Sequence, residues 1–123
     1  MELEIVIPTY NRPKCIESYL IHLNKYYGKY DFGVYIIDSG TDCETEKVVK
    51  KYSYVRYEKI NSNIDVDEKT IYALKKTIGN FVFLCGDGYA LNVDMVFETI
   101  SFDNSIDIYA LYDKRCQSQE QIM

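Results

Sequence analysis

The chain has 123 residues, of which 47% are hydrophobic and 27% are charged, and its formal net charge is -5. These values are typical of one globular domain with a core of its own, and they exclude a disordered chain. The acidic balance argues against nucleic acid or an anionic membrane surface as the main partner, because either would require a basic patch. A nucleotide ligand stays compatible with this charge, since backbone N–H groups, a helix N-terminus or a metal can hold its phosphates.

Neither the hydropathy pattern nor the cysteines indicate export or membrane insertion. No apolar run approaches the roughly 20 residues that span a bilayer, and strand-like sequence starts at Glu2 without a signal peptide. The four cysteines form no CxxC pair and there is a single histidine, so neither a zinc site nor a disulfide framework is expected. We expect a cytoplasmic protein without a transmembrane segment, peripheral at the inner face of the membrane only through partners or segments outside this chain.

The predicted elements alternate between strand and helix from the start of the chain. Glu2–Ile7 is a short apolar run closed by Pro8, which predicts a buried strand. Pro13 suits the first position of a helix, and apolar residues at helical spacing continue this helix to a stop at Gly28. Phe32–Ile37 is predicted to be the second strand.

The next elements are a capped helix and a less apolar strand. Thr41 and Glu44 have the S/T-x-x-E spacing of a capping box, which predicts that their side chains cap a helix reciprocally. Tyr54–Lys59 then predicts a third strand near an edge of the sheet. Ile71 and Ile78 belong to an apolar stripe at helical spacing, which predicts a further helix before the following strand.

The last part of the chain continues the alternation. Phe81–Cys85 predicts a fourth, fully buried strand, and a short helix is predicted around Val93–Ile100. A final strand is predicted at Ile106–Tyr112, and the polar tail 113–123 is expected to be partly disordered. The sequence thus predicts one domain over residues 1–112, with α/β architecture in three layers and a mostly parallel sheet.

Ligands bind beyond the carboxyl ends of the strands in such sheets, and the junctions there carry suitable side chains. A rigid proline, a hydroxyl and a ring at Pro8–Tyr10 suit a flat base, although a simple turn would explain them equally well. Asp38 suits a base N–H or a ribose hydroxyl, or it closes a turn. Asp87 stands between Gly86 and Gly88, where the backbone can approach a diphosphate and a carboxylate can face a cation, or where the chain simply turns.

Taken in order, the segments IVIPTYNR, YIIDSGTD and GNFVFLCGDG resemble family 2 glycosyltransferases of the GT-A fold over roughly residues 3–97. The resemblance implies a truncated GT-A-like domain that binds a nucleotide-diphospho-sugar donor, usually a UDP-sugar and sometimes a dTDP- or GDP-sugar. The positions that match the family's nucleotide-binding residues are Pro8, Thr9, Tyr10, Asp38, Asn63 and, in place of the family's arginine, Lys69.

The chain departs from the family at the metal site and at its acceptor half. The resemblance implies Mn²⁺ or Mg²⁺ held by a DxD motif, but the two aspartate positions fall on Gly86 and Gly88, which leaves Asp87 as the metal residue. The acceptor site and the catalytic base of the family lie in a segment longer than the remainder of this chain. We expect a donor-binding part of an enzyme that glycosylates a glycan or lipid-linked acceptor in polysaccharide biosynthesis.

Two other interpretations remain open from the sequence. The first is a non-catalytic nucleotide-binding or assembly module of the same fold, whose metal site is degenerate because GDG replaces DxD. The second is an unrelated doubly wound domain, such as a receiver or a flavodoxin-like module. Pro-Thr-Tyr at the end of the first strand is poor chemistry for a receiver, and no GxGxxG or P-loop motif is present.

Overall fold

The structure, a computed structural model, describes residues 1–88 and 91–102. The chain divides into two compact units, Met1–Val93 and Asp94–Met123, which are described separately. The predicted strand at Ile106–Tyr112 and the predicted tail lie outside the described residues. Among the described helices, none is long and apolar enough to cross a membrane.

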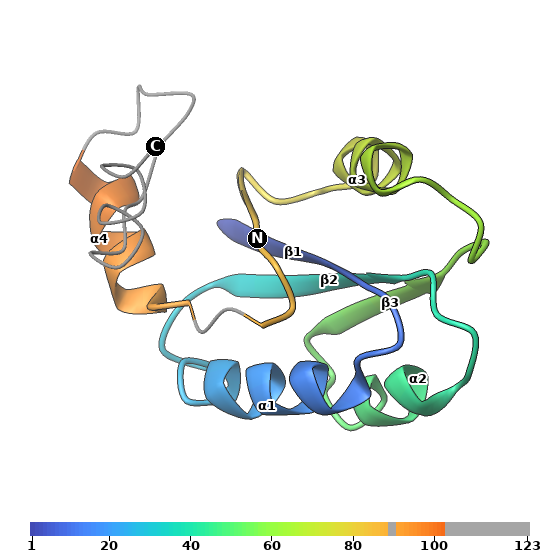
Figure 1. Ribbon diagram of the computed structural model, residues 1–123. Coiled ribbons are helices and arrows are strands. Elements are labelled where there is room, and N and C mark those ends of the chain that lie inside the picture. Colours follow the sequence, from blue (N-terminus) through green and yellow to red (C-terminus); the bar gives the residue numbers. More distant parts are fainter. Residues whose placement is uncertain (89–90, 103–123) are drawn as a thin grey trace, which may run out of the picture. The chain divides into compact units, whose positions relative to one another are not determined.

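The first unit is built on a sheet of parallel strands (Figure 1). The strands are β1 (Leu3–Thr9), β2 (Phe32–Asp38), β3 (Val55–Lys59) and β4 (Phe81–Leu84), in the order β3-β2-β1-β4. All three neighbouring pairs are parallel, as expected for strands joined by helical crossovers. The four strands predicted within the described residues are therefore confirmed, with ends that differ by one or two residues. The prediction that the fourth strand is fully buried is wrong, because β4 lies at the edge of the sheet and its Val82 and Leu84 are 39% and 44% exposed.

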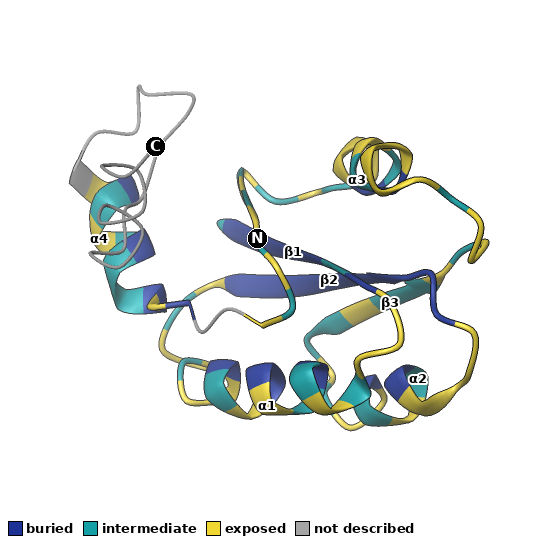
Figure 2. Ribbon diagram, viewed as in Figure 1, coloured by how far each residue is buried: buried dark blue, intermediate teal, exposed yellow. Residues whose placement is uncertain are grey.

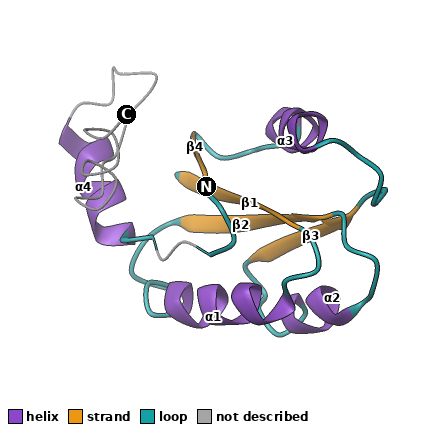
Figure 3. Ribbon diagram, in the orientation of Figure 1, coloured by secondary structure: helices purple, strands orange, loops and turns teal. Residues whose placement is uncertain are grey.

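Helices cover both faces of this sheet, which gives three layers (Figures 1 and 3). Helices α1 (Pro13–Asn24) and α2 (Glu44–Val49) lie on one face, and α3 (Val66–Lys75) lies on the other. Helix α4 (Val93–Phe102) follows, and all of it beyond Val93 belongs to the second unit. The predicted three-layer α/β architecture with a parallel sheet is confirmed.

The core of the first unit lies mainly between the sheet and α1. Val6 and Tyr35 pack with Ala73 of α3, so the alternate strand residues, such as Ile5 and Ile36, face α1 and α2. The fully buried apolar residues on this second side include Leu3, Ile5, Ile7, Ile16, Leu20, Leu23 and Ile36. Figure 2 shows β1 and β2 as the buried centre of the unit.

The apolar stripe that predicts α3 points away from the sheet. Ile71 is 53% exposed and Ile78 is 67% exposed, whereas the buried residues of α3 are Lys69 and Ala73. The helix exists as predicted, but its buried side is different. The reason lies in the sheet, where Glu58 of β3 accepts hydrogen bonds from α3 and draws the polar side of the helix inward.

The predicted capping box at the start of α2 is wrong. Cys43 occupies the N-cap position without a side-chain hydrogen bond, and the N–H of Glu44 donates to Asp42 Oδ1 at 3.0 Å. The Thr41 N–H instead donates to Asn11 Oδ1 at 2.8 Å. Thr41 is thus held by a loop far away in the sequence, which takes it out of reach of the helix.

The order of the strands defines a region at the carboxyl ends of β1, β2 and β4, which is called the crevice below. The chain runs from β1 outward through β2 to β3, and then returns to place β4 on the other side of β1. The order of connection therefore reverses between β1 and β4. In open parallel sheets, ligands bind beyond the carboxyl ends of the strands at such a reversal.

Candidate nucleotide-binding site

The carboxyl ends of β1, β2 and β4 bring three of the predicted residues together. Thr9 lies opposite Asp38 in the register of β1 and β2. The Cys85 N–H donates to the Val6 carbonyl at 3.0 Å, which fixes the end of β4 beside β1. Thr9 Oγ1 then donates to Asp87 Oδ2 at 2.9 Å, across a separation of 78 residues in the sequence.

The Asp87 carboxylate is enclosed by donors and a positive charge. Arg12 Nη1 lies 2.9 Å from Asp87 Oδ1, and Thr9 donates to the other carboxylate oxygen. The Asp87 side chain is only 11% exposed, while that of Arg12 is 54% exposed. Arg12 therefore stands between the carboxylate and solvent, and sequence reasoning did not identify it as a site residue.

Asp38 is held firmly within its own loop. It is 1% exposed, its Oδ1 accepts the Gly40 N–H at 2.7 Å, and its Oδ2 accepts the Tyr57 hydroxyl at 2.6 Å. Burial and this hydrogen bond raise the pKa of Tyr57. A Cβ on Gly40 would lie 2.7 Å from Asn11 Oδ1 and 2.8 Å from Asp38 Oδ1, so a larger residue would displace these side chains. Each oxygen of this carboxylate keeps a second lone pair that could accept a further hydrogen bond.

Lys69 places a buried positive charge beneath the same edge. Its Nζ donates to the Thr9 carbonyl at 3.2 Å and to Ser39 Oγ at 2.8 Å. Burial lowers the pKa of Lys69, and the nearby carboxylates of Asp38 and Asp87 oppose that shift. The lysine thus connects α3 to the ends of β1 and β2, and it partly balances the two carboxylates.

The remaining predicted residues occupy more open positions. Pro8 is half-buried and Tyr10 is 50% exposed, so the tyrosine ring is available to a flat ligand at the end of β1. Asn63 is exposed in the loop between β3 and α3, where its N–H donates to Asn61 Oδ1 at 2.9 Å. The roles of these residues in binding stay predictions.

Asn11 is a second site residue that sequence reasoning missed. Its φ of 51° lies in the left-handed region, which asparagine tolerates better than most residues. Its side chain accepts the Thr41 N–H at 2.8 Å and donates to the Thr41 hydroxyl at 3.2 Å. The loop after β1 is therefore tied to the loop after β2. An asparagine directly after a strand was the available signal.

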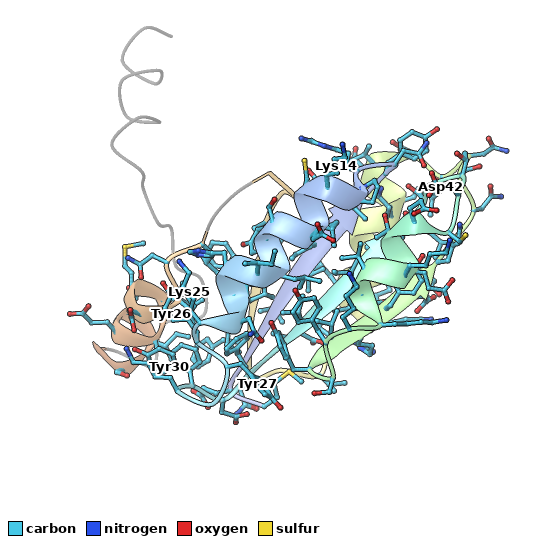
Figure 4. All side chains as sticks on the ribbon, turned by 90° about the horizontal axis from the view of Figure 1, so that it is seen from below. Lys14, Lys25, Tyr26, Tyr27, Tyr30 and Asp42 are labelled. Carbon is cyan, nitrogen blue, oxygen red and sulfur yellow. The ribbon has the colours of Figure 1, made fainter. Side chains whose placement is uncertain are left out.

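A cavity of about 320 Å³ opens beside Asp87, along α1. Its lining includes Lys14, Cys15, Ser18, Tyr19, His22 and Asp87. In Figure 4, Lys14 of α1 lies near the same end of the molecule as Asp42, while Lys25 and Tyr30 lie toward the other end. The cavity therefore runs along α1 from Lys14 in its first turn to His22 in its last turn, with Asp87 and Gly88 beside it.

The residues at this site do not fit the divalent cation that the family resemblance implies. In the described part of the chain, no group of three or more His, Cys, Asp or Glu residues could hold a metal ion. Both oxygens of Asp87 already pair with Arg12 and Thr9, and both oxygens of Asp38 accept internal hydrogen bonds. The Asp87 loop thus offers one enclosed carboxylate beside a positive charge, whereas Mn²⁺ and Mg²⁺ take a set of oxygen ligands.

Comparison with known proteins identifies the family. The model of glycosyl transferase family 2 matches residues 4–87, which is more than half of the chain. The chain therefore belongs to glycosyl transferase family 2, and the resemblance seen in its sequence is confirmed. No curated protein matches the sequence closely enough to add to this assignment.

Solved structures show the same fold. The mannosyltransferase PcManGT from Pyrobaculum calidifontis, in complex with GDP-Man and Mn²⁺, superposes with a TM-score of 0.55 at 17% identity. The galactosyltransferase LgtC, in complex with donor and acceptor sugar analogs, gives a TM-score of 0.50 at 12% identity. The matches cover 71% and 68% of this chain, but only 27% and 37% of those proteins. This chain has the GT-A fold and spans a minor part of either relative.

Proposed function

We propose that this chain binds the nucleoside diphosphate of a nucleotide-sugar donor in the crevice at the carboxyl ends of β1, β2 and β4. The observation that carries the proposal is the meeting of Thr9, Asp38 and Asp87 at the point where the strand order reverses. The family match supports it, because it covers all three residues. PcManGT holds GDP-Man and LgtC holds a donor analog, so both relatives bind such donors.

The residues of the crevice divide into a base end and a phosphate end. The exposed Tyr10 ring stacks on the base, with Pro8 beside it. Asp38 accepts a hydrogen bond from a base N–H or a ribose hydroxyl, and Gly40 and Tyr57 hold its carboxylate in one orientation. Asn63 belongs to the base end by its place in the family motif. The diphosphate lies toward Asp87, above the buried charge of Lys69.

The donor is a UDP-sugar in this proposal, and the acceptor is a glycan or a lipid-linked sugar in polysaccharide biosynthesis. Transfer requires a base that deprotonates the acceptor hydroxyl, and the relatives carry most of their length outside the region that this chain matches. The chain thus supplies the donor half of a cytoplasmic enzyme, and the acceptor half comes from a segment or partner outside this chain.

Calorimetric titration tests the proposal, with UDP and GDP as ligands for the wild type and for Asp38→Asn. Asp38→Asn keeps the shape of the side chain but removes its charge and one acceptor. We expect the dissociation constant to rise roughly 10- to 100-fold, as for the loss of a hydrogen bond to a charged group. Asp42→Asn, an exposed change in the same loop, serves as the control and should leave binding unchanged.

Thermal unfolding of Asp38→Asn accompanies the titration, because Asp38 is buried and its loss can affect the fold. A variant that unfolds cooperatively near the wild-type temperature and binds the nucleotide as tightly as the wild type would refute the role of Asp38. Absence of heat with both nucleotides at millimolar concentration would refute the proposed function itself.

A non-catalytic module of the same fold is the second candidate, and one observation favours it. Arg12 and Thr9 pair with the carboxylate of Asp87, the one acidic residue left where GDG replaces the family's DxD. Donor hydrolysis in the full-length protein distinguishes the two candidates. Turnover of a nucleotide sugar supports the enzyme, whereas binding without turnover supports the module.

A further inference from the structure

The phosphate end of the crevice carries positive charge where a metal site would need acidic ligands. The loop after β4 reads Cys85-Gly86-Asp87-Gly88, so it contributes one carboxylate. That carboxylate is paired with Arg12 at 2.9 Å, and the buried amine of Lys69 lies beneath the neighbouring strand ends. A diphosphate that enters this region meets an arginine before it meets a carboxylate.

The position of Arg12 suits the recognition of phosphate. Arginine has five N–H donors in a planar fork that matches phosphate oxygens. Within residues 1–88 and 91–102, Arg12 makes its side-chain contacts through Nη1 and Nη2. Nη1 faces Asp87 and Nη2 lies 3.3 Å from Cys15 Sγ. The Arg12 side chain is 54% exposed while that of Asp87 is 11% exposed, so the arginine is the partner of this ion pair that a second anion can reach.

We propose that Arg12 neutralises the diphosphate of the donor, so that nucleotide binding by this chain does not depend on a divalent cation. This inference rests on the proposed function, since it assigns the phosphate end of the same crevice. Asp87 is then a positioning residue, which Thr9 holds in place and which holds Arg12 at the crevice in the absence of ligand. Lys69 adds a fixed positive charge beneath.

A metal-dependent site and the Arg12 site predict opposite effects of neutralising Asp87 on diphosphate binding. If Asp87 ligated Mn²⁺ or Mg²⁺, its neutralisation would weaken the binding of a diphosphate. If Asp87 only holds Arg12, its neutralisation releases the arginine and removes the repulsion between a carboxylate and the phosphates. The variant Asp87→Asn therefore separates the two models, and Thr9 can still donate to the amide oxygen of the asparagine.

The experiment is a titration of the whole chain with UDP, in EDTA and again with Mn²⁺. We expect the wild-type dissociation constants in the two conditions to agree within about twofold. Arg12→Ala should weaken UDP binding roughly 10- to 100-fold, the loss typical of a charge-assisted hydrogen bond. Arg12→Lys keeps the charge without the planar fork, so its affinity should be intermediate.

Two controls accompany this titration. Lys25→Ala removes one positive charge at the opposite end of α1 from Arg12, where Figure 4 shows Lys25, and should leave UDP binding unchanged. Uridine, followed by NMR titration, lacks the diphosphate and should bind Arg12→Ala and the wild type alike. Asp87→Asn should bind UDP in EDTA at least as tightly as the wild type.

The outcomes separate the inference from the proposed function. The inference is overturned if Mn²⁺ strengthens wild-type UDP binding by about tenfold or more and Asp87→Asn loses that gain. It is also overturned if Arg12→Ala binds UDP like the wild type. In both cases the nucleotide still binds, so the proposed function survives. If the wild type binds neither UDP nor uridine in either condition, the proposed function fails together with the inference.

Discussion

The two faces of the sheet are built from different chemistry. The face toward α1 and α2 is apolar, with Ile5, Ile36 and Leu20 fully buried. The face toward α3 includes a buried glutamate, Glu4, whose Oε2 pairs with Arg56 at 2.9 Å. The comparison indicates that the first face supplies most of the hydrophobic stabilisation, because apolar burial is the dominant favourable term in folding.

The polar face instead fixes the position of α3. Glu4 Oε1 accepts the N–H of Ile78 at 2.7 Å, just after the helix, and Glu58 accepts hydrogen bonds from Tyr72 and Lys76. Hydrogen bonds have directional preferences that apolar contacts lack, so they define where the helix lies. That placement matters for function, because it delivers the amine of Lys69 to the ends of β1 and β2.

The largest expected loss of stability follows a substitution on the apolar face. Leu20→Ala removes a fully buried side chain between α1 and the sheet, and we expect the free energy of unfolding to fall by about 2–5 kcal/mol. Ile71→Ala on the exposed side of α3 is the matched control, with an expected change within about 0.5 kcal/mol. Urea unfolding of both variants measures the difference. Equal losses would show that the α3 stripe is buried after all.

A smaller effect is expected at Glu4. Glu4→Gln preserves the shape of the side chain but removes the charge that pairs with Arg56, so we expect a loss of about 2 kcal/mol. The loss stays moderate because Arg56 is half-exposed and water can solvate it. Glu17→Gln, at an exposed ion pair, should change stability by less than about 1 kcal/mol. A Glu4→Gln variant as stable as the wild type would contradict the role of the polar face.

The smallest effect concerns the pH dependence of stability. Burial alone would raise the pKa of Glu58, but hydrogen bonds from Tyr72, Lys76 and Tyr35 outweigh burial and lower it. A carboxylate with a lowered folded pKa stabilises the protein above its unfolded pKa, about 4.3, and this contribution is lost as the pH falls through the folded value.

Glu58→Gln should therefore flatten the acid side of the stability profile. As the pH falls from about 6 to about 3, the wild type should lose more stability than the variant. Urea unfolding at several pH values measures both curves, and Glu44→Gln, at an exposed pair on α2, is the control. Parallel curves for the wild type and Glu58→Gln would rule out this contribution of Glu58.

Local patterns in the sequence predicted the four described strands, and they also pointed to the carboxyl end of the sheet, where the structure brings Thr9, Asp38 and Asp87 together. Each buried strand is a compact apolar run. The residues that close it, such as Pro8 and Asp38, can be recognised from the local sequence without knowledge of the neighbouring strands. Lys69 was also predicted as a site cation, although its buried position beside Thr9 and Ser39 could not be foreseen.

The features that the sequence did not predict depend on contacts between distant segments. Thr41 has the local signal of a cap, but Asn11, 30 residues earlier, holds it instead. The buried side of α3 depends on charged residues of the strands, and the spacing of apolar residues within the helix gives no information about them. Arg12 joins the site through its ion pair with Asp87, a residue that follows the last strand of the sheet. Such pairings become visible only when the strand order is known.

NMR titration with UDP tests most directly whether the crevice binds a nucleotide. Backbone amide shifts of the chain show which residues sense the ligand. We predict shifts concentrated at residues 9–12, 39–41 and 86–88, with little change around Tyr27 and Tyr30 at the opposite end of the molecule. An absence of shifts at millimolar UDP and GDP, or shifts confined to that opposite end, would contradict the account.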